Sequence, residues 1–205
     1  MTKTLRQWAG MTPPDSITPH TTALILIDLQ MDYFTPGKLL IPDGERVIAR
    51  AGQLRAWANE RGIAVVHIKQ LSKPTSPLFA EGTAGAAIHP RLAPRAGETV
   101  ITKTFPSSFD QTELPAFLHT RGITTLILAG LMTHMCVETT ARAAAPLGYA
   151  VTVAADACAS RDLPAYDGDG IIAHQEVHRN ALTALADRFA DILSTEAILQ
   201  LAVSG

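Results

Sequence analysis

Three chemically active side chains stand at or just after apolar runs of the sequence. Asp28 follows the run Leu-Ile-Leu-Ile, Lys103 ends the segment TVITK, and Cys136 lies in GLMTHMCVETTARAA. In an open parallel sheet, ligands bind beyond the carboxyl ends of the strands. If these apolar runs are strands of one such sheet, the three side chains converge although they are far apart in the sequence.

Cys136 is the candidate nucleophile. It lies near the start of an expected helix, where unpaired backbone N–H groups and the helix dipole lower a thiol pKa and favour the thiolate. The same N–H groups can hold the oxyanion of a tetrahedral intermediate, so acyl transfer is the natural reaction class. The alternative is that Cys136 is a small buried hydrophobic residue, the usual fate of a cytosolic cysteine.

Asp28 is the candidate general base and Lys103 the third catalytic group. A buried carboxylate must find a partner or raise its pKa, and a raised pKa suits a base that works near neutrality. Beside the other two groups, the Lys103 ammonium would favour both the thiolate and the ionised carboxylate. The alternatives are an ion pair or helix cap for Asp28 and a solvated strand-end ammonium for Lys103.

The histidines do not offer a better base. His134 precedes Cys136 by two residues and would point in a different direction on a helix, and His67 alternates with apolar neighbours as a core histidine does. His174 and His178 share a helix face, but nothing with defined spacing completes a metal site there, so no metal is expected.

Two other residues stand near an apolar run further along the chain. We interpret Cys158 as a packing residue and Asp156 as a second polar group at a strand end that supports the site.

Short apolar runs alternate with helical segments, which predicts an α/β fold: an open, doubly wound parallel sheet of about six strands with helices on both faces, in three α/β/α layers. The expected strands are 23–29, 63–69, 99–103, 123–129, 150–154 and, more weakly, 189–193. The expected helices are 45–59, 113–120, 135–147, 170–187 and 195–202.

The 205 residues fit one domain, 1–205, with residues 1–20 as an N-terminal extension. Residues 70–98 contain four prolines and three glycines without clear periodicity, so we expect a functional loop that overhangs the site. The apolar segment 197–203 is either an interface between copies or a helix packed on its own sheet.

Composition narrows the possible partners and location. The formal charge is −2 and there is no run of Lys and Arg, so we expect no nucleic-acid partner, and no apolar stretch approaches the length needed to span a membrane. With no signal-like N-terminus and only Cys136 and Cys158 as thiols, we expect a cytoplasmic protein whose partners are small molecules or copies of itself.

The segment GLMTHMCVETTARAAAPLGYAVTVAADACAS resembles the signature of the isochorismatase-like cysteine hydrolases. The segments LILIDLQMDYF and ITKTFPSSF, and the spacer FAEGTAGAAIHPRLAPRAGE, resemble other regions of that family. The resemblance spans roughly residues 23–194, and its three separated motifs occur in the family's order.

The resemblance implies roles for particular residues. Asp28 would accept the thiol proton, Lys103 would stabilise the charges, and Cys136 would attack. A cis peptide between Leu131 and Met132 would turn the Met132 N–H toward that of Cys136 to form an oxyanion hole. The resemblance further implies a homodimer or larger homo-oligomer and no organic cofactor, and we expect the substrate pocket to be shaped by Gln30, Tyr33, Phe34, Phe105, Phe109 and His134.

Two departures from family patterns bear on the substrate. After the second strand the chain reads HIKQLSKPTSP, without the Asp-Trp-His metal segment of nicotinamidases, and it keeps the cysteine that isochorismate hydrolases typically lack. We therefore expect cleavage of a C–N bond in an amide, ureido compound or lactam through a thioester. The alternatives are an isochorismate-type vinyl ether hydrolase and a catalytically silent binding or redox module.

Overall fold

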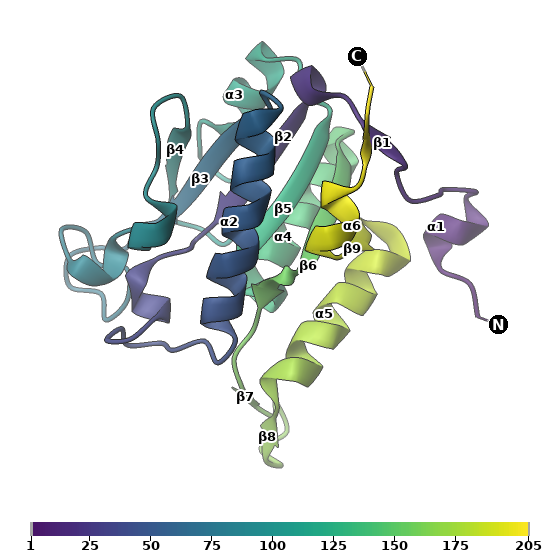
Figure 1. Cartoon of the computed structure of the whole chain (residues 1–205). Helices are drawn as coiled ribbons and strands as arrows, with labels where there is room; N and C mark the ends of the chain where they lie inside the picture. Colours follow the sequence, from purple (N-terminus) through teal and green to yellow (C-terminus); the bar gives the residue numbers. More distant parts are fainter. Residues whose placement is uncertain (1, 205) are drawn as a thin grey trace.

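A six-stranded parallel sheet lies at the centre of the computed structural model, which describes residues 2–204 (Figure 1). Its spatial order is β4-β3-β2-β5-β6-β9, and every neighbouring pair is parallel. The strands are β2 (Thr22–Ile27), β3 (Ala64–Gln70), β4 (Thr99–Lys103), β5 (Thr125–Leu131), β6 (Ala150–Ala159) and β9 (Asp191–Leu193). The predicted fold class is confirmed.

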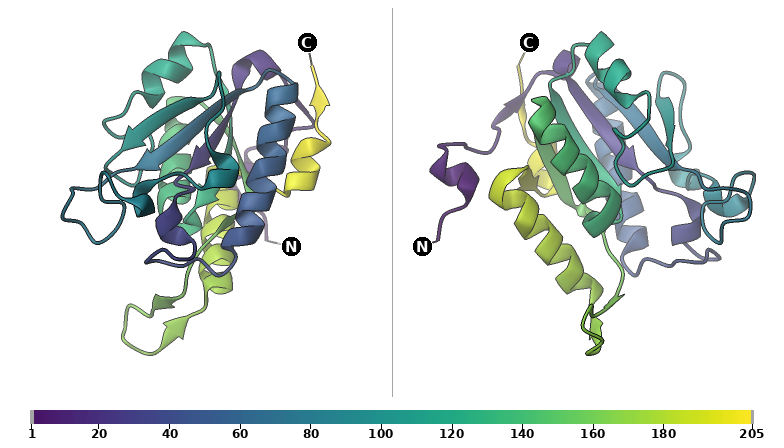
Figure 2. Two further views of the ribbon diagram at one scale, coloured as in Figure 1. Left: turned by 60° about the vertical axis from the view of Figure 1, so that its left-hand side comes forward. Right: turned by 180° about the vertical axis from the view of Figure 1, so that it is seen from behind.

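Helices cover both faces of this sheet, as the views in Figure 2 show. One face carries α2 (Gly44–Glu60) and α6 (Thr195–Leu199), and the other carries α3 (Leu114–Thr120), α4 (Glu138–Ala144) and α5 (His174–Arg188). A further short helix, α1 (Leu5–Trp8), lies in the N-terminal segment.

The continuous apolar run of β2 follows from its place between these two layers. All six residues of the strand are buried. Leu24 and Leu26 pack into the core on the α2 side, whereas Ala23, Ile25 and Ile27 pack into the core on the opposite side. Because a strand in this position is covered on both faces, apolar and polar residues do not alternate along it. The first charged residue after the apolar run, Asp28, directly follows the carboxyl end of the strand.

Several element boundaries differ from the sequence prediction because pairing with distant residues decides them. β6 continues past residue 154 to Ala159, since its ladder with β5 resumes after an irregularity near Gly130. The expected helix 170–187 begins only at His174, because β8 (Ile171–Ile172) pairs with β7 (Leu163–Pro164) in an antiparallel hairpin. This hairpin projects from the body of the molecule (Figure 1).

The C-terminal segment is also shorter as a helix than expected. α6 ends at Leu199, and β10 (Ala202–Val203) then pairs with β1 (Ser16–Ile17). Ile198 is completely buried in the core beneath α2. The helical part of the segment 197–203 therefore packs on its own sheet, which was one of the two alternatives for this stretch.

The long segment between β3 and β4 is anchored against the short helix η2 (Met31–Tyr33). It contains two 3₁₀ turns, η3 (Ala84–Ala86) and η4 (Pro90–Leu92). The buried Asp32 carboxylate accepts a hydrogen bond from the Phe79 N–H at 2.6 Å, and it lies so close to Gly85 that a Cβ there would be 2.2 Å from Oδ1. A glycine is therefore required where this loop meets η2.

Within residues 2–204, no helix is long and apolar enough to cross a membrane.

Candidate active site

Asp28, Lys103 and Cys136 converge at the carboxyl edge of the sheet. Asp28 comes directly after β2, Lys103 ends β4, and Cys136 lies in the helical turn η5 (Thr133–Val137) that follows β5. The Lys103 Nζ is 2.7 Å from Asp28 Oδ2 and 3.4 Å from Cys136 Sγ. The Asp28 and Lys103 side chains are 0% exposed, so this contact is shielded from water.

The Asp28 carboxylate retains capacity to accept a proton. Its backbone adopts a left-handed conformation with φ of 49°, as the chain turns sharply out of the strand. Neither of its oxygens accepts a well-aligned hydrogen bond from the described part of the chain, so the Lys103 ammonium stabilises it chiefly through charge. Burial raises the pKa of Asp28 above its ordinary value, and the Lys103 charge acts in the opposite direction.

The Cys136 thiol is protonated in this resting arrangement. Burial raises its pKa far above the ordinary value, the negative Asp28 raises it further, and Lys103 opposes both effects. The expectation that the start of a helix lowers this pKa is wrong, because desolvation of a nearly enclosed sulfur outweighs the backbone dipoles. Thiolate formation therefore requires the proton to move to a neighbouring base, and Asp28 is the adjacent carboxylate.

The turn before Cys136 is shaped by close backbone approach. The peptide between Leu131 and Met132 is cis, as the family resemblance implied. Gly130 has φ of 135°, and a Cβ at this position would lie 2.0 Å from the Ile27 carbonyl oxygen. Only glycine fits there, and this lets β5 deliver the turn directly above the end of β2. The Met132 and Cys136 N–H groups, which we expected to form an oxyanion hole, both belong to this turn.

Two of the expected pocket residues border the catalytic groups. The Tyr33 ring is buried, and its pKa is raised well above the ordinary value by burial and then by the negative charge of Asp28. Phe105 is 43% exposed, and its carbonyl oxygen accepts a hydrogen bond from Lys103 at 3.1 Å.

His134 lies beside Cys136 in sequence but is directed elsewhere. Its Nδ1 is 3.0 Å from the Ser160 hydroxyl, and burial lowers the pKa of its imidazole. It also lines a separate cavity of about 500 Å³ beneath the β7–β8 hairpin.

Two residues expected at the site, one polar and one aromatic, are used for other purposes. Gln30 is completely buried, and its side-chain amide pairs with the backbone of Gln70 and Ala86, which leaves it as a support and not a free pocket group. Phe109 packs against Tyr149 with ring centroids 5.8 Å apart and contacts the core on the face of the sheet that carries α3, α4 and α5.

Phe34 and Asp156 likewise have partners of their own. Phe34 contacts His89 edge-on and borders a cavity of about 330 Å³ that contains none of the three catalytic candidates. Asp156 accepts hydrogen bonds from the Thr195 N–H and hydroxyl and pairs with Arg50, so it fastens α6 and α2 to β6 and does not support the site as expected.

Several interpretations of isolated residues can now be compared with the structure. His67 is a buried histidine 2.7 Å from Glu98, as expected for a core histidine, and Cys158 is completely buried in the core with a pKa raised to about 12 by burial. His174 pairs with Asp162, and His178 with the Thr133 hydroxyl. No group of three metal-ligating side chains gathers anywhere in residues 2–204.

Sequence reasoning missed Gln70 and Arg161. The Gln70 Oε1 lies 2.7 Å from Lys103 Nζ, and the only available signal was its place at the end of a strand. Arg161 follows β6, and its charge acts on the pKa values of Tyr33 and His134. Its Nε is buried without a hydrogen-bond partner among the described residues, so this guanidinium has unused donor capacity near the site.

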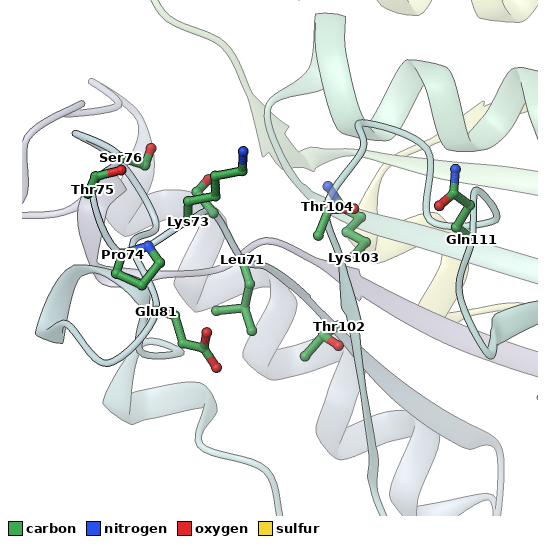
Figure 3. A pocket seen from close by; sticks show the side chains of 11 residues that line it. Leu71, Lys73, Pro74, Thr75, Ser76, Glu81, Thr102, Lys103, Thr104 and Gln111 are labelled. Atoms are coloured by element: carbon green, nitrogen blue, oxygen red, sulfur yellow. The ribbon is translucent and has the colours of Figure 1, made fainter.

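An open cavity of about 890 Å³ reaches Lys103 from the surface (Figure 3). One wall is the loop after β3, with Lys73, Pro74, Thr75 and Ser76, and the facing wall carries Thr102, Thr104 and Gln111. The side chains are mostly polar, and the walls come from segments on either side of Lys103. The expectation that the long loop overhangs the site agrees with this arrangement.

Comparison with known proteins places this geometry in a family. The isochorismatase domain model matches residues 22–197. A secreted isochorismatase effector from Verticillium dahliae is 34% identical over 91% of this chain and 94% of its own length. Maleamate amidohydrolase from Pseudomonas putida is 29% identical, with 87% of this chain and 85% of that protein covered.

The fold agrees with the sequence match. The crystal structure of an isochorismatase from Pseudomonas putida superimposes with a TM-score of 0.89 at 30% identity and covers 96% of this chain and 99% of that one. The family model extends from the first residue of β2 to α6 and so includes all three catalytic candidates. The chain belongs to the isochorismatase family of hydrolases.

Proposed function

We propose that the protein is a cysteine hydrolase that cleaves a C–N bond of a small amide, ureido compound or lactam through a thioester intermediate. The observation that carries the proposal is the buried contact of the Lys103 ammonium with both Asp28 and Cys136. Nucleophilic catalysis by a protonated cysteine needs an adjacent proton acceptor, and the Asp28 carboxylate can serve as one here. The amidohydrolase among the relatives supports the choice of bond.

Acylation would begin with transfer of the Cys136 proton to the Asp28 carboxylate. The resulting thiolate attacks the substrate carbonyl carbon, and the negative charge moves to the carbonyl oxygen, where the Met132 and Cys136 N–H groups donate hydrogen bonds. When the C–N bond breaks, the proton on Asp28 passes to the leaving nitrogen. This step yields a thioester on Cys136, a free amine or ammonia, and an ionised Asp28.

Deacylation would use the same carboxylate a second time. Asp28 accepts a proton from a water molecule as that water attacks the thioester carbonyl. Collapse of the second tetrahedral intermediate breaks the C–S bond, and the sulfur recovers the proton from Asp28. The Lys103 ammonium lies between the two groups and stabilises the negative charge wherever it resides in the cycle.

The surroundings of the site favour a substrate that carries an acidic group. The Nε of Arg161 is buried and has no hydrogen-bond partner within residues 2–204. A guanidinium binds a carboxylate through two parallel hydrogen bonds, so a carboxylate on the substrate would be a suitable acceptor. Its charge acts on the pKa of Tyr33, whose own pKa also responds to Asp28. We therefore include an N-carbamoyl amino acid and an amide of a dicarboxylic acid among the substrates to be tested.

Location and assembly complete the proposal. We place the enzyme in the cytoplasm because both cysteines are free thiols, which a reducing compartment preserves. We also propose that it assembles as a homo-oligomer, since the exposed side chains of Trp8, Tyr166 and Ile171 leave apolar surface for contact between copies.

The proposal is tested by intact mass spectrometry and turnover assays on wild type, Cys136→Ala and the matched thiol control Cys158→Ala. The substrates are neutral amides, acidic amides, N-carbamoyl amino acids, a lactam and isochorismate. We expect a covalent acyl adduct and amide turnover in wild type and Cys158→Ala, and neither in Cys136→Ala. Turnover of isochorismate that survives in Cys136→Ala would instead identify a vinyl ether hydrolase, and no adduct or turnover in any variant would indicate a silent relative.

A further inference from the structure

Lys103 has more neighbours than a simple ion pair requires. Its Nζ is 2.7 Å from Asp28 Oδ2, 2.7 Å from Gln70 Oε1, 3.1 Å from the Phe105 carbonyl oxygen and 3.4 Å from Cys136 Sγ. An ammonium has three hydrogens, so these four acceptors compete for them. Two of the acceptors, from Gln70 and Phe105, are neutral oxygens that take no part in proton transfer.

The Gln70 side chain is held in one orientation. Its Nε2 donates to the Leu71 carbonyl oxygen at 3.3 Å, which directs Oε1 toward Lys103. The opposite orientation would place an N–H group against an ammonium that can only donate. The amide oxygen therefore serves as a fixed acceptor for one ammonium hydrogen.

The backbone of Gln70 is fixed on both sides. It is paired with Lys103 in the β3–β4 register, and the Leu71 N–H donates to the Lys103 carbonyl oxygen at 2.9 Å. On the other side, Gln30 Oε1 accepts from the Gln70 N–H and Gln30 Nε2 donates to the Gln70 carbonyl oxygen, both at 2.8 Å. Beyond the end of β2, the completely buried Gln30 side-chain amide thus makes the two hydrogen bonds to the Gln70 backbone that a neighbouring strand would otherwise make.

We propose, on the basis of the function proposed above, that Gln70 is a positioning residue that holds the Lys103 ammonium in contact with both Asp28 and Cys136. When the proton passes from Cys136 to Asp28, negative charge moves from the carboxylate to the sulfur. Gln70 and Phe105 each accept one hydrogen of the ammonium and the third points to Sγ, while the Asp28 carboxylate is stabilised chiefly by the positive charge. The cation therefore already faces the sulfur when the thiolate forms, without displacement of the side chain.

Two variants separate this role from simple packing. Gln70→Met keeps the length of the side chain but removes the amide oxygen, and Gln70→Glu keeps an oxygen but adds a negative charge beside the ammonium. In either case Lys103 stabilises the Cys136 thiolate less well. Gln53→Met, an exposed substitution of the same kind on α2, is the matched control, and circular dichroism with thermal unfolding checks the folding of each variant.

The measurement is the rate of Cys136 alkylation by iodoacetamide between pH 5 and 10, located by peptide mass mapping, together with kcat and KM on the best substrate. A hydrogen bond to a charged group contributes about 1.5–3 kcal/mol, so we expect Gln70→Met to react and turn over roughly 10- to 100-fold more slowly at neutral pH. Because the Cys136 pKa lies far above its ordinary value, we expect the alkylation rate to rise with pH throughout this range and the Gln70→Met rate to stay below the wild-type rate at every pH, with KM nearly unchanged. Gln70→Glu should show at least as large a decrease, and Gln53→Met none.

The two proposals fail in distinguishable ways. If both folded Gln70 variants alkylate and turn over with the wild-type profile, the positioning role is overturned while the cysteine mechanism stands. If the wild-type Cys136 neither reacts with iodoacetamide in this range nor forms an acyl adduct with any substrate, both proposals are overturned. A loss of activity in Gln70→Met with an unchanged alkylation profile would assign Gln70 to substrate binding and would also refute the role proposed here.

Discussion

The buried Asp28–Lys103 pair leads to a prediction about stability. Replacing either charged side chain alone by a neutral one should destabilise the fold more than replacing both. The side chains are 0% exposed and the charged atoms are 2.7 Å apart. At an effective dielectric constant of about 20, two unit charges at that separation attract by about 6 kcal/mol. Burial of each ion costs several kcal/mol, so the intact pair is close to neutral in its net effect.

Removal of one partner leaves the other charge buried and unpaired. We expect Lys103→Met and Asp28→Asn each to lower the free energy of unfolding by about 3–5 kcal/mol. The double variant contains no buried charge, and we expect it to lose only about 0–2 kcal/mol. All three variants should lack hydrolase activity, so stability and catalysis separate cleanly at this site.

The pH dependence of Lys103→Met gives a second readout. Without the ammonium, burial alone acts on Asp28 and raises its folded pKa further above the ordinary value. A carboxyl with a raised folded pKa contributes stability at low pH that is lost as the pH rises above about 4. The single variant should therefore weaken from pH 4 upward, while the double variant lacks this dependence.

Urea unfolding of the four proteins at pH 5 and pH 8, followed by circular dichroism, measures both effects. The expected coupling energy between the two substitutions is at least about 3 kcal/mol and far exceeds the roughly 0.5 kcal/mol seen for independent sites. If the double variant loses the sum of the two single losses, the groups are not a buried pair in solution and the reasoning is refuted.

Two further predictions concern the support of the site. Gly130→Ala places a Cβ 2.0 Å from the Ile27 carbonyl oxygen in a conformation with φ of 135°. We therefore expect urea unfolding to show a free energy of unfolding lowered by more than about 3 kcal/mol, together with lost activity. Wild-type stability in this variant would contradict the close approach. The buried His67–Glu98 pair predicts that the fold is less stable in acid. The pKa values of both groups are lowered, so their contribution to the free energy of unfolding is present above about pH 6.5 and is lost as the pH falls. In a His67→Gln variant, the urea midpoint should change less between pH 7 and pH 5 than it does in wild type.

The elements of the fold could be predicted where their own residues decide them. The strand ahead of Asp28 is apolar throughout because both its faces are covered, and the Arg-Gly-Ile segments after α2 and α3 mark where two helices end. The β7–β8 hairpin and the extension of β6 to Ala159 could not be predicted in this way. They depend on pairing with residues that carry no local signature.

The site shows the same division. Asp28, Lys103 and Cys136 could be found because their residue types at strand ends are unusual for an apolar sheet. Gln70 is equally placed, but a glutamine there has no chemistry of its own, and its role depends on the distance to Lys103. Phe109 shows the opposite error, since proximity in sequence to Lys103 does not reveal that the turn carries its ring to Tyr149.

The direction of the Cys136 pKa could not be obtained from position alone either. A helix start argues for a lowered value, whereas the degree of enclosure decides the outcome. Enclosure depends on how segments far apart in the chain pack around the sulfur, among them the end of β4, whose Lys103 Nζ lies 3.4 Å from Sγ.

The anchoring of the long loop has a consequence for the divergence of substrate range among related enzymes. The stretch 72–78 lies between two fixed points, the Leu71 N–H on the Lys103 carbonyl and the Phe79 N–H on Asp32. Insertions or replacements in this stretch can reshape the outer wall of the cavity while the catalytic groups stay in register (Figure 3). Substitutions in this exposed part of the loop can thus change substrate specificity with little effect on the buried side chains at the carboxyl edge of the sheet.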